Sequence, residues 1–158
     1  MGRRYTIPIA AVASPAAIFD AWEVLAAANK PVKILRIVIG QTSDVGDAAE
    51  EILTASIIRG HTTSGSGGTV VTPQPVDDVD TAAGAVVETM NTTIASAGTP
   101  ETTHVITWNE RVGLDHIFPS GSEPRTDLVT ANNRTVVRIS APADAVTISG
   151  YIEIEEGV

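Results

Sequence analysis

The 158-residue chain is predicted to be an all-β protein, an antiparallel, jelly-roll-like β-sandwich. About eight to ten strands are expected. Several segments alternate apolar and polar residues with the period of two that is typical of half-buried strands. Clusters of Gly, Pro, Asp and Asn separate these segments at short intervals. No segment has the pattern of a long helix, and strands do not alternate with helices, which disfavours an α/β fold.

The C-terminal part contains the clearest strand pattern. Residues 146–155 place four apolar side chains on an inward face and polar ones between them. These four are Val146, Ile148, Ile152 and Ile154. A second strand is expected over 134–140. Because the connector 141–144 has the turn chemistry of Pro142 and Asp144, we expect the two strands to form an antiparallel hairpin.

Residues 32–40 are rich in β-branched side chains and are expected to form a central strand. Residues 18–25 alternate as a strand with Ile18, Trp22 and Val24 inward. A short helix is the alternative for 18–25, because Ala and Leu favour helices. Asn29-Lys30-Pro31 breaks the chain between these two segments.

Further strands are expected over 52–59, 85–93, 102–109 and 112–118. The first of these places Ile52, Thr54, Ser56 and Ile58 on one face. Tyr5–Ile9 is expected at a sheet edge, where Pro8 is tolerated.

The length suits a single β-sandwich domain over 1–158, with an N-terminal arm at 1–15 and a long loop at 60–84. Within that loop, 60–68 is rich in Gly and Ser and is expected to be flexible, whereas 72–80 is acidic and stiffened by proline. An excursion of this length is expected either to be disordered or to be held by a neighbouring subunit.

Charge and composition disfavour two classes of partner. The net charge of −9 repels phosphate backbones, so we expect no nucleic-acid partner. The most apolar run, 32–40, is interrupted by Lys33 and Arg36 and is far shorter than the roughly 20 residues of a membrane helix. We therefore expect no membrane partner. The absence of cysteine excludes disulfides and thiolate metal sites.

No catalytic or cofactor-binding set is apparent, so the chain is expected not to be an enzyme and to carry no cofactor. Residues 64–68 lack the Gly-x-Ser-x-Gly spacing of a nucleophile elbow and the Gly-Lys-Ser/Thr of a phosphate loop. The three histidines, His61, His104 and His116, form no close pair in the sequence. His104 and His116 would meet only if their strands pair.

Two acidic clusters are the weak candidates for a metal site, because hard cations require several oxygen ligands. Asp77, Asp78 and Asp80 lie in one cluster. Asp44, Asp47, Glu50 and Glu51 lie in the other, which is expected to be an acidic loop or a helical turn. Neither has EF-hand spacing, and the alternative is that both are solvated loops.

Two stretches, 30–51 and 57–68, carry a resemblance to known proteins. The likeness extends through Asn91-Thr-Thr93, Trp108-Asn109 and Ala141-Pro-Ala-Asp144 to the final strand, so it covers most of the chain. On these residues the sequence resembles small virion proteins encoded in the structural gene clusters of tailed phages and prophages, of the capsid decoration (cement) type.

This resemblance implies a virion structural protein on the capsid surface, assembled in the cytoplasm of the bacterial host. The implied partners are the major capsid protein and further copies of the chain in a homotrimer. Two alternatives stay open: a head–tail, tail or baseplate component, and a glycan- or receptor-binding jelly-roll module with aromatic side chains clustered at one end.

Overall fold

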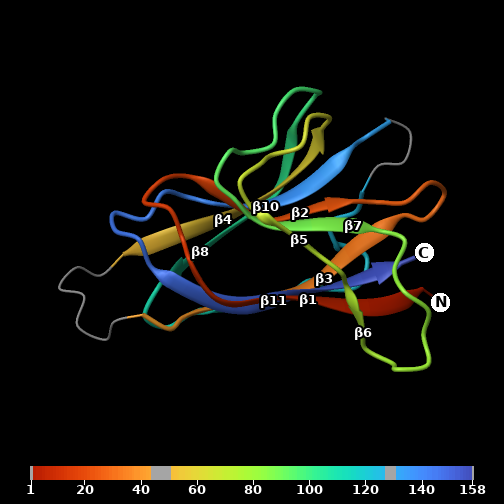
Figure 1. Ribbon diagram of the computed structural model, residues 1–158, viewed down its shortest axis with the longest axis horizontal. Coiled ribbons are helices and arrows are strands. Elements are labelled where there is room, and N and C mark those ends of the chain that lie inside the picture. Colours follow the sequence, from red (N-terminus) through yellow and green to blue (C-terminus); the bar gives the residue numbers. More distant parts are fainter. Residues whose placement is uncertain (1, 44–50, 127–130, 158) are drawn as a thin grey trace.

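The computed structural model describes residues 2–43, 51–126 and 131–157. These residues form two antiparallel sheets packed face to face, so the predicted all-β, jelly-roll-like sandwich is confirmed (Figure 1). The five-stranded sheet contains, in spatial order, β6 (Gln74–Pro75), β1 (Arg3–Ala13), β11 (Thr147–Glu156), β3 (Val32–Gln41) and β9 (Leu114–Ile117). The six-stranded sheet contains β5 (Thr69–Val71), β7 (Val86–Asn91), β2 (Phe19–Leu25), β10 (Arg134–Ile139), β4 (Ile52–His61) and β8 (Glu101–Asn109).

The core lies between the two sheets and is built from isoleucine, valine and a few aromatic residues. Its largest fully buried side chains include Trp22, Tyr5, Phe19, Ile7, Ile34, Ile37, Ile57, Ile139, Ile152 and Ile154. Each such side chain contributes roughly 1.5–3 kcal/mol through removal from water. The Trp22 Nε1–H also donates to the Ile7 carbonyl at 3.0 Å, which joins β2 of one sheet to β1 of the other.

The inward face predicted for the last strand is confirmed, because Val146, Ile148, Ile152 and Ile154 are all buried. The predicted hairpin with β10 is wrong. β11 pairs with β1 and β3, whereas β10 pairs with β2 and β4 in the opposite sheet. The connector after Ile139 therefore crosses from one sheet to the other. Pro and Asp marked the break in the strand correctly, but turn chemistry does not specify which neighbour the next strand joins.

Residues 18–25 form a strand, and the alternative of a short helix is excluded. Trp22 and Val24 are buried as predicted, whereas the inward placement of Ile18 is wrong because it is 45% exposed. The strand begins at Phe19, which takes the buried position instead. β2 is buried on both faces, so its polar residues Asp20 and Glu23 are buried too.

Strands are present as predicted at β3, β4, β7 and β8, and β3 lies between two neighbours. On β4 the predicted face of Ile52, Thr54, Ser56 and Ile58 is the outer one, while Leu53, Ala55 and Ile57 are buried. The strand expected over 112–118 is shorter, Leu114–Ile117. A turn precedes it, in which the Val112 and Gly113 amides donate to the Asn109 carbonyl.

The segment expected as an N-terminal arm contributes β1 to the chain's own sheet. β1 pairs with β11 from Arg3 to Ala13 and buries Tyr5, Ile7 and Ile9 in the core. On its other side β6 pairs only with Tyr5 and Thr6, so Pro8 lies where β1 has no described strand beside it. The long loop expected over 60–84 includes the end of β4 and the two short strands β5 and β6.

No helix among the described residues is long and apolar enough to cross a membrane.

Candidate functional site

Two loops lie together on the outer face of the six-stranded sheet and rise above it, away from the other sheet (Figure 1). They are residues 62–68, which join β4 to β5, and residues 92–99, which join β7 to β8. Together we call them the loop platform. Four backbone hydrogen bonds of 2.9–3.0 Å link them, two between Thr63 and Ser96 and two between Ser66 and Thr93.

Asp20 on β2 fixes one of these loops to the sheet. Its carboxylate is fully buried and forms a two-point ion pair with Arg138 on β10, at 2.6 and 3.1 Å. The Ala95 amide donates to Asp20 Oδ2 at 2.7 Å, and Arg138 Nη2 donates back to the Ala95 carbonyl at 2.9 Å. The loop 92–99 is therefore held at Ala95 by both partners of the ion pair.

Glu23 fixes the other loop in the same way. Arg134 Nε lies 2.6 Å from Glu23 Oε1, and the Ser64 hydroxyl donates to the same oxygen at 2.6 Å. The Gly65 amide and Asn91 Nδ2 both donate to Oε2 at 2.9 Å. All four interactions bind a carboxylate that is 2% exposed.

The position of these carboxylates explains why they are paired so completely. An isolated charge taken out of water costs several kcal/mol, which only a well-formed ion pair with further hydrogen bonds offsets. β2 is covered by β7 and β10 at its edges, by the core on one face and by the loop platform on the other. The charges on β2 and β10 therefore act as fixed attachment points for the loops.

Glycine is required where the loops approach the sheet. A Cβ on Gly68 would collide with the Thr89 carbonyl oxygen and the Asn91 side chain. A Cβ on Gly65 would lie 2.9 Å from Asn91 Nδ2. The Gly/Ser composition of 60–68 thus reflects close packing, and the prediction that this segment is flexible is wrong.

His61, at the end of β4, is 5% exposed, and its side chain lies near the same charges. Burial lowers the pKa of the imidazole, and the nearby positive charge of Arg138 lowers it further, while Asp20 acts in the opposite direction. The ring is therefore neutral in the folded protein at neutral pH.

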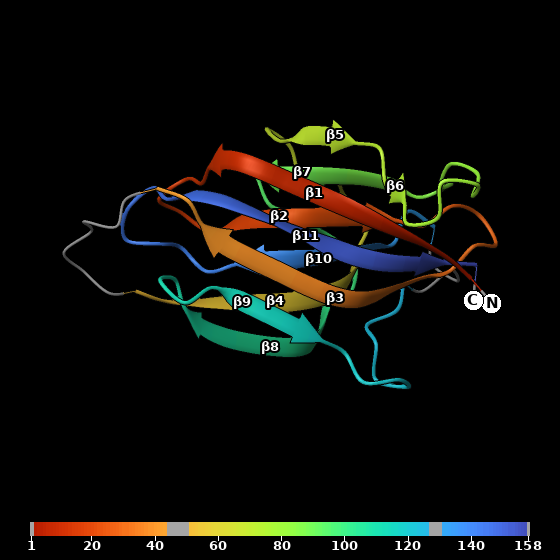
Figure 2. The same cartoon turned by 90° about the horizontal axis from the view of Figure 1, so that it is seen from below.

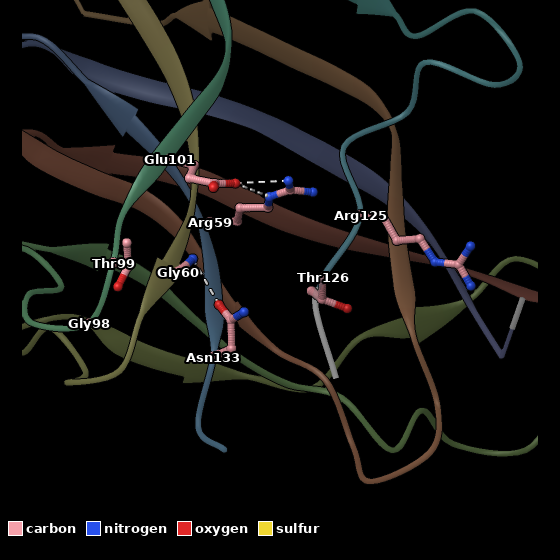
Figure 3. Close-up of a pocket in the computed structure, with 8 residues that line it drawn as sticks. All are labelled: Arg59, Gly60, Gly98, Thr99, Glu101, Arg125, Thr126 and Asn133. Carbon is pink, nitrogen blue, oxygen red and sulfur yellow. Dashed lines mark hydrogen bonds and ion pairs between the residues drawn. The ribbon is translucent and has the colours of Figure 1, made fainter. Parts of the chain in front are cut away.

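A cavity of about 560 Å³ opens beside the end of the platform (Figure 3). It is lined by Arg59, Gly60, Gly98, Thr99, Glu101, Arg125, Thr126 and Asn133. Its charged groups are engaged: Arg59 donates to Glu101 at 2.8 and 3.0 Å. Figure 3 shows Arg125 directed away from that pair. Thr126 Oγ1 accepts a hydrogen bond from the Val32 amide at 2.9 Å and donates one to the Val32 carbonyl at 3.3 Å.

The predicted metal candidates are not brought into a cation-binding group. Asp80 lies 3.2 Å from Arg3 in an ion pair, and Asp77 accepts a hydrogen bond from the Val79 amide at 3.2 Å. Within 2–43, 51–126 and 131–157, no group of three or more acidic or histidine side chains has a metal-binding arrangement. Asp44, Asp47 and Glu50 lie outside the described residues, and Glu51 accepts from the Ala143 amide at 2.9 Å.

His104 and His116 approach the same residue although their strands do not pair. β8 and β9 are edge strands of opposite sheets. Both imidazoles contact the Phe118 ring edge to face, with centroids 4.9 and 4.7 Å apart. They line the side of the sandwich as packing residues around a shared aromatic ring.

The residues that build the platform attachments, among them Asp20 and Glu23, were not predicted from the sequence. A signal was present: two acidic residues interrupt an apolar segment, and two arginines recur four positions apart at 134 and 138. Opposite charges on neighbouring strands predict ion pairs, but only the pairing of β2 with β10 brings them together.

Comparison with models of known protein families found none that matches the chain, and comparison with curated proteins found no match either.

Proposed function

We propose that the chain is a non-enzymatic virion structural protein, a capsid decoration protein that binds the major capsid protein on the outer shell as a homotrimer. The observation that carries this proposal is the loop platform, a surface that is fixed by buried ion pairs and presents only small uncharged side chains. The fold and the sequence resemblance support the same conclusion.

The platform differs from the rest of a chain whose net charge is −9. Its exposed residues are Thr63, Ser66, Gly67, Gly68, Thr92, Thr93, Ser96, Ala97, Gly98 and Thr99. None carries a charge, so docking requires no desolvation of an ionised group. Because the loops are already ordered, binding also loses little conformational entropy. A fixed, uncharged surface of this kind suits repeated docking on a regular shell.

The buried carboxylates support a structural role. Asp20 and Glu23 are saturated by arginine and backbone donors, as described above. Glu156 accepts from the Ala85 and Gly84 amides at 2.7 and 3.1 Å and lies 3.7 Å from Lys30 Nζ. A catalytic acid or base must exchange a proton with a substrate, whereas these three groups are occupied in holding loops.

The described aromatic residues do not support a sugar-binding module. Trp22, Tyr5, Phe19, Trp108 and Phe118 are all buried. Tyr151 is half-buried beneath the Arg36 guanidinium, 5.8 Å from its ring centroid. A glycan-binding jelly roll requires several exposed rings close together, and these residues do not provide them.

The proposal is tested with particles of the encoding phage that lack this chain, to which purified protein is added back. We expect bound copies in numbers comparable with the major capsid protein. Replacing Ser66 and Thr93 together by lysine should abolish binding, because both residues are exposed and lie where the two loops of the platform pair with each other. Val79→Lys, at an 82% exposed position in another loop, is the matched control and should bind normally.

Two results would contradict the proposal. Binding of only a few copies per particle would assign the chain to the neck, tail or baseplate instead. Normal binding by the Ser66→Lys, Thr93→Lys variant would exclude the platform as the docking surface.

A further inference from the structure

The four sheet edges are protected unequally. Three edge strands are very short: β6 has 2 residues, β5 has 3 and β9 has 4. The part of β1 that β6 leaves uncovered contains Pro8, which has no N–H to donate. β8, the fourth, has 9 residues and lies at the margin of the six-stranded sheet, with no described strand beyond it (Figure 2). A long edge strand offers a row of unpaired backbone groups to another chain.

The backbone of β8 alternates between its neighbour β4 and the free edge. Just beyond the strand, the Glu110 amide donates to the Glu51 carbonyl at 3.1 Å. In an antiparallel ladder every second residue bonds to the same neighbour. Counting back from Glu110 in steps of two, the backbone N–H and C=O groups of Trp108, Ile106 and His104 bond to β4. The N–H and C=O groups of Thr107 and Val105 therefore point to the free edge, whereas the Asn109 carbonyl accepts from the Val112 and Gly113 amides of the following turn.

The side chains of β8 also allow a second chain to approach. No charged side chain lies between Glu101 and Glu110. The segment also contains no lysine or proline, the residues that discourage pairing at a sheet edge. Val105 is 62% exposed and Thr107 is exposed beside it. An irregularity in the pairing with β4 falls between His104 and Thr102, so the regular part of the edge is 104–109.

We infer that β8 pairs antiparallel with β8 of a second copy of this chain, about a twofold axis at Ile106. In this register Val105 lies opposite Thr107 of the partner copy, and each such pair exchanges two backbone hydrogen bonds. Ile106 faces its own counterpart, and both flanking pairs lie inside the regular segment. The two six-stranded sheets then form one continuous sheet.

The charge pattern favours a second copy as the occupant. Two copies with a combined charge of twice −9 repel each other over most of their surfaces. The twofold pairing at Ile106 opposes no like charges, because the charged residues nearest the strand, Glu101 and Glu110, lie at or beyond its ends. A β-branched residue opposite threonine also makes a favourable cross-strand pair. The contact is independent of shell binding and can join chains of neighbouring trimers.

Sedimentation velocity on the purified chain tests this pairing separately from capsid binding. Val105→Lys with Thr107→Lys places four lysines around the axis, so the variant should have at most half the mass of the wild type. Val70→Lys, at a 66% exposed position on the other edge strand of the same sheet, should keep the wild-type mass. Equal masses for wild type and the β8 variant would overturn the inference.

Cross-linking tests the register in a chain that contains no cysteine of its own. Residues facing each other in a non-hydrogen-bonded antiparallel pair have Cα atoms roughly 4.5 Å apart, within disulfide range. Ile106→Cys should therefore form a disulfide-linked dimer on mild oxidation, and Val70→Cys should not. Cross-linking of Ile106→Cys no greater than that of Val70→Cys would overturn the pairing.

Discussion

The outer face of the six-stranded sheet has two halves, which differ in whether loops cover them and in whether they carry charged side chains. Over β2 and β10 the face is covered by the loop platform, and its charged side chains are buried in ion pairs. Over β4 and β8 the face is uncovered and carries Thr, Ser, Val and Ile without charge. The comparison teaches that ion pairs are buried where loops of the same chain cover the sheet, whereas the half of the face without such a cover carries neutral side chains.

The largest effect is expected from breaking the Asp20 attachment. Asp20→Ala leaves Arg138 buried without its partner and frees the Ala95 amide. Removing one partner of a buried pair costs about 3–5 kcal/mol, and chemical denaturation measures this loss directly. Arg138→Ala should cost a similar amount, and the double variant should cost clearly less than the sum. A loss below about 1 kcal/mol for Asp20→Ala would show that the attachment does not stabilise the fold.

A smaller loss is expected when a methyl group is forced beneath the platform. Gly68→Ala places its Cβ against the Thr89 carbonyl and should destabilise the protein by about 1–3 kcal/mol, as overpacking does. Gly40→Ala is the matched control, because its Cβ would meet only the Ser149 carbonyl oxygen at 3.9 Å. Equal thermal midpoints for the two variants would mean that the loop does not lie on the sheet as described.

The covered half should also lose stability in mild acid. The pKa of His61 is lower in the folded protein than its usual value of about 6.5, because burial and Arg138 disfavour the charged ring. The unfolded chain therefore binds the proton first, and stability should fall as pH drops below about 6.5. His61→Gln should remove this part of the pH dependence, measured by thermal unfolding between pH 5 and 8. An unchanged slope in His61→Gln would contradict the assignment.

The smallest effect is expected on the uncovered half. Val105→Thr changes an exposed side chain on β8 and should alter the free energy of unfolding by less than about 0.5 kcal/mol. Together with Asp20→Ala, it measures how unequally the two halves contribute to the fold. A loss comparable with that of Asp20→Ala would mean that β8 is covered within the monomer.

The sequence was sufficient to predict the fold class and most strands, because alternation along one strand depends only on which face is buried. The inward side chains of β11 illustrate this. Pairing between strands was not predictable in the same way, as the incorrect β10–β11 hairpin shows, because turn residues do not determine the sheet that a strand joins. The platform was missed for a related reason: Asp20 meets Arg138 only through strand pairing across 118 positions.

Composition was misleading at one particular place. Gly and Ser in 60–68 are typical of flexible linkers, yet in this chain the same residues allow a loop to lie against Thr89 and Asn91. A short side chain suits both a flexible linker and a loop that packs against a sheet. Only the buried Glu23 beneath the loop shows that this segment is of the second kind.

Electron cryomicroscopy of the intact virion tests the central claim most directly. We expect many copies of the chain on the capsid exterior, with residues 62–68 and 92–99 facing the shell and β8 beside β8 of another copy. A map in which the chain occurs only in the tail, or in which the platform faces solvent, would contradict this account.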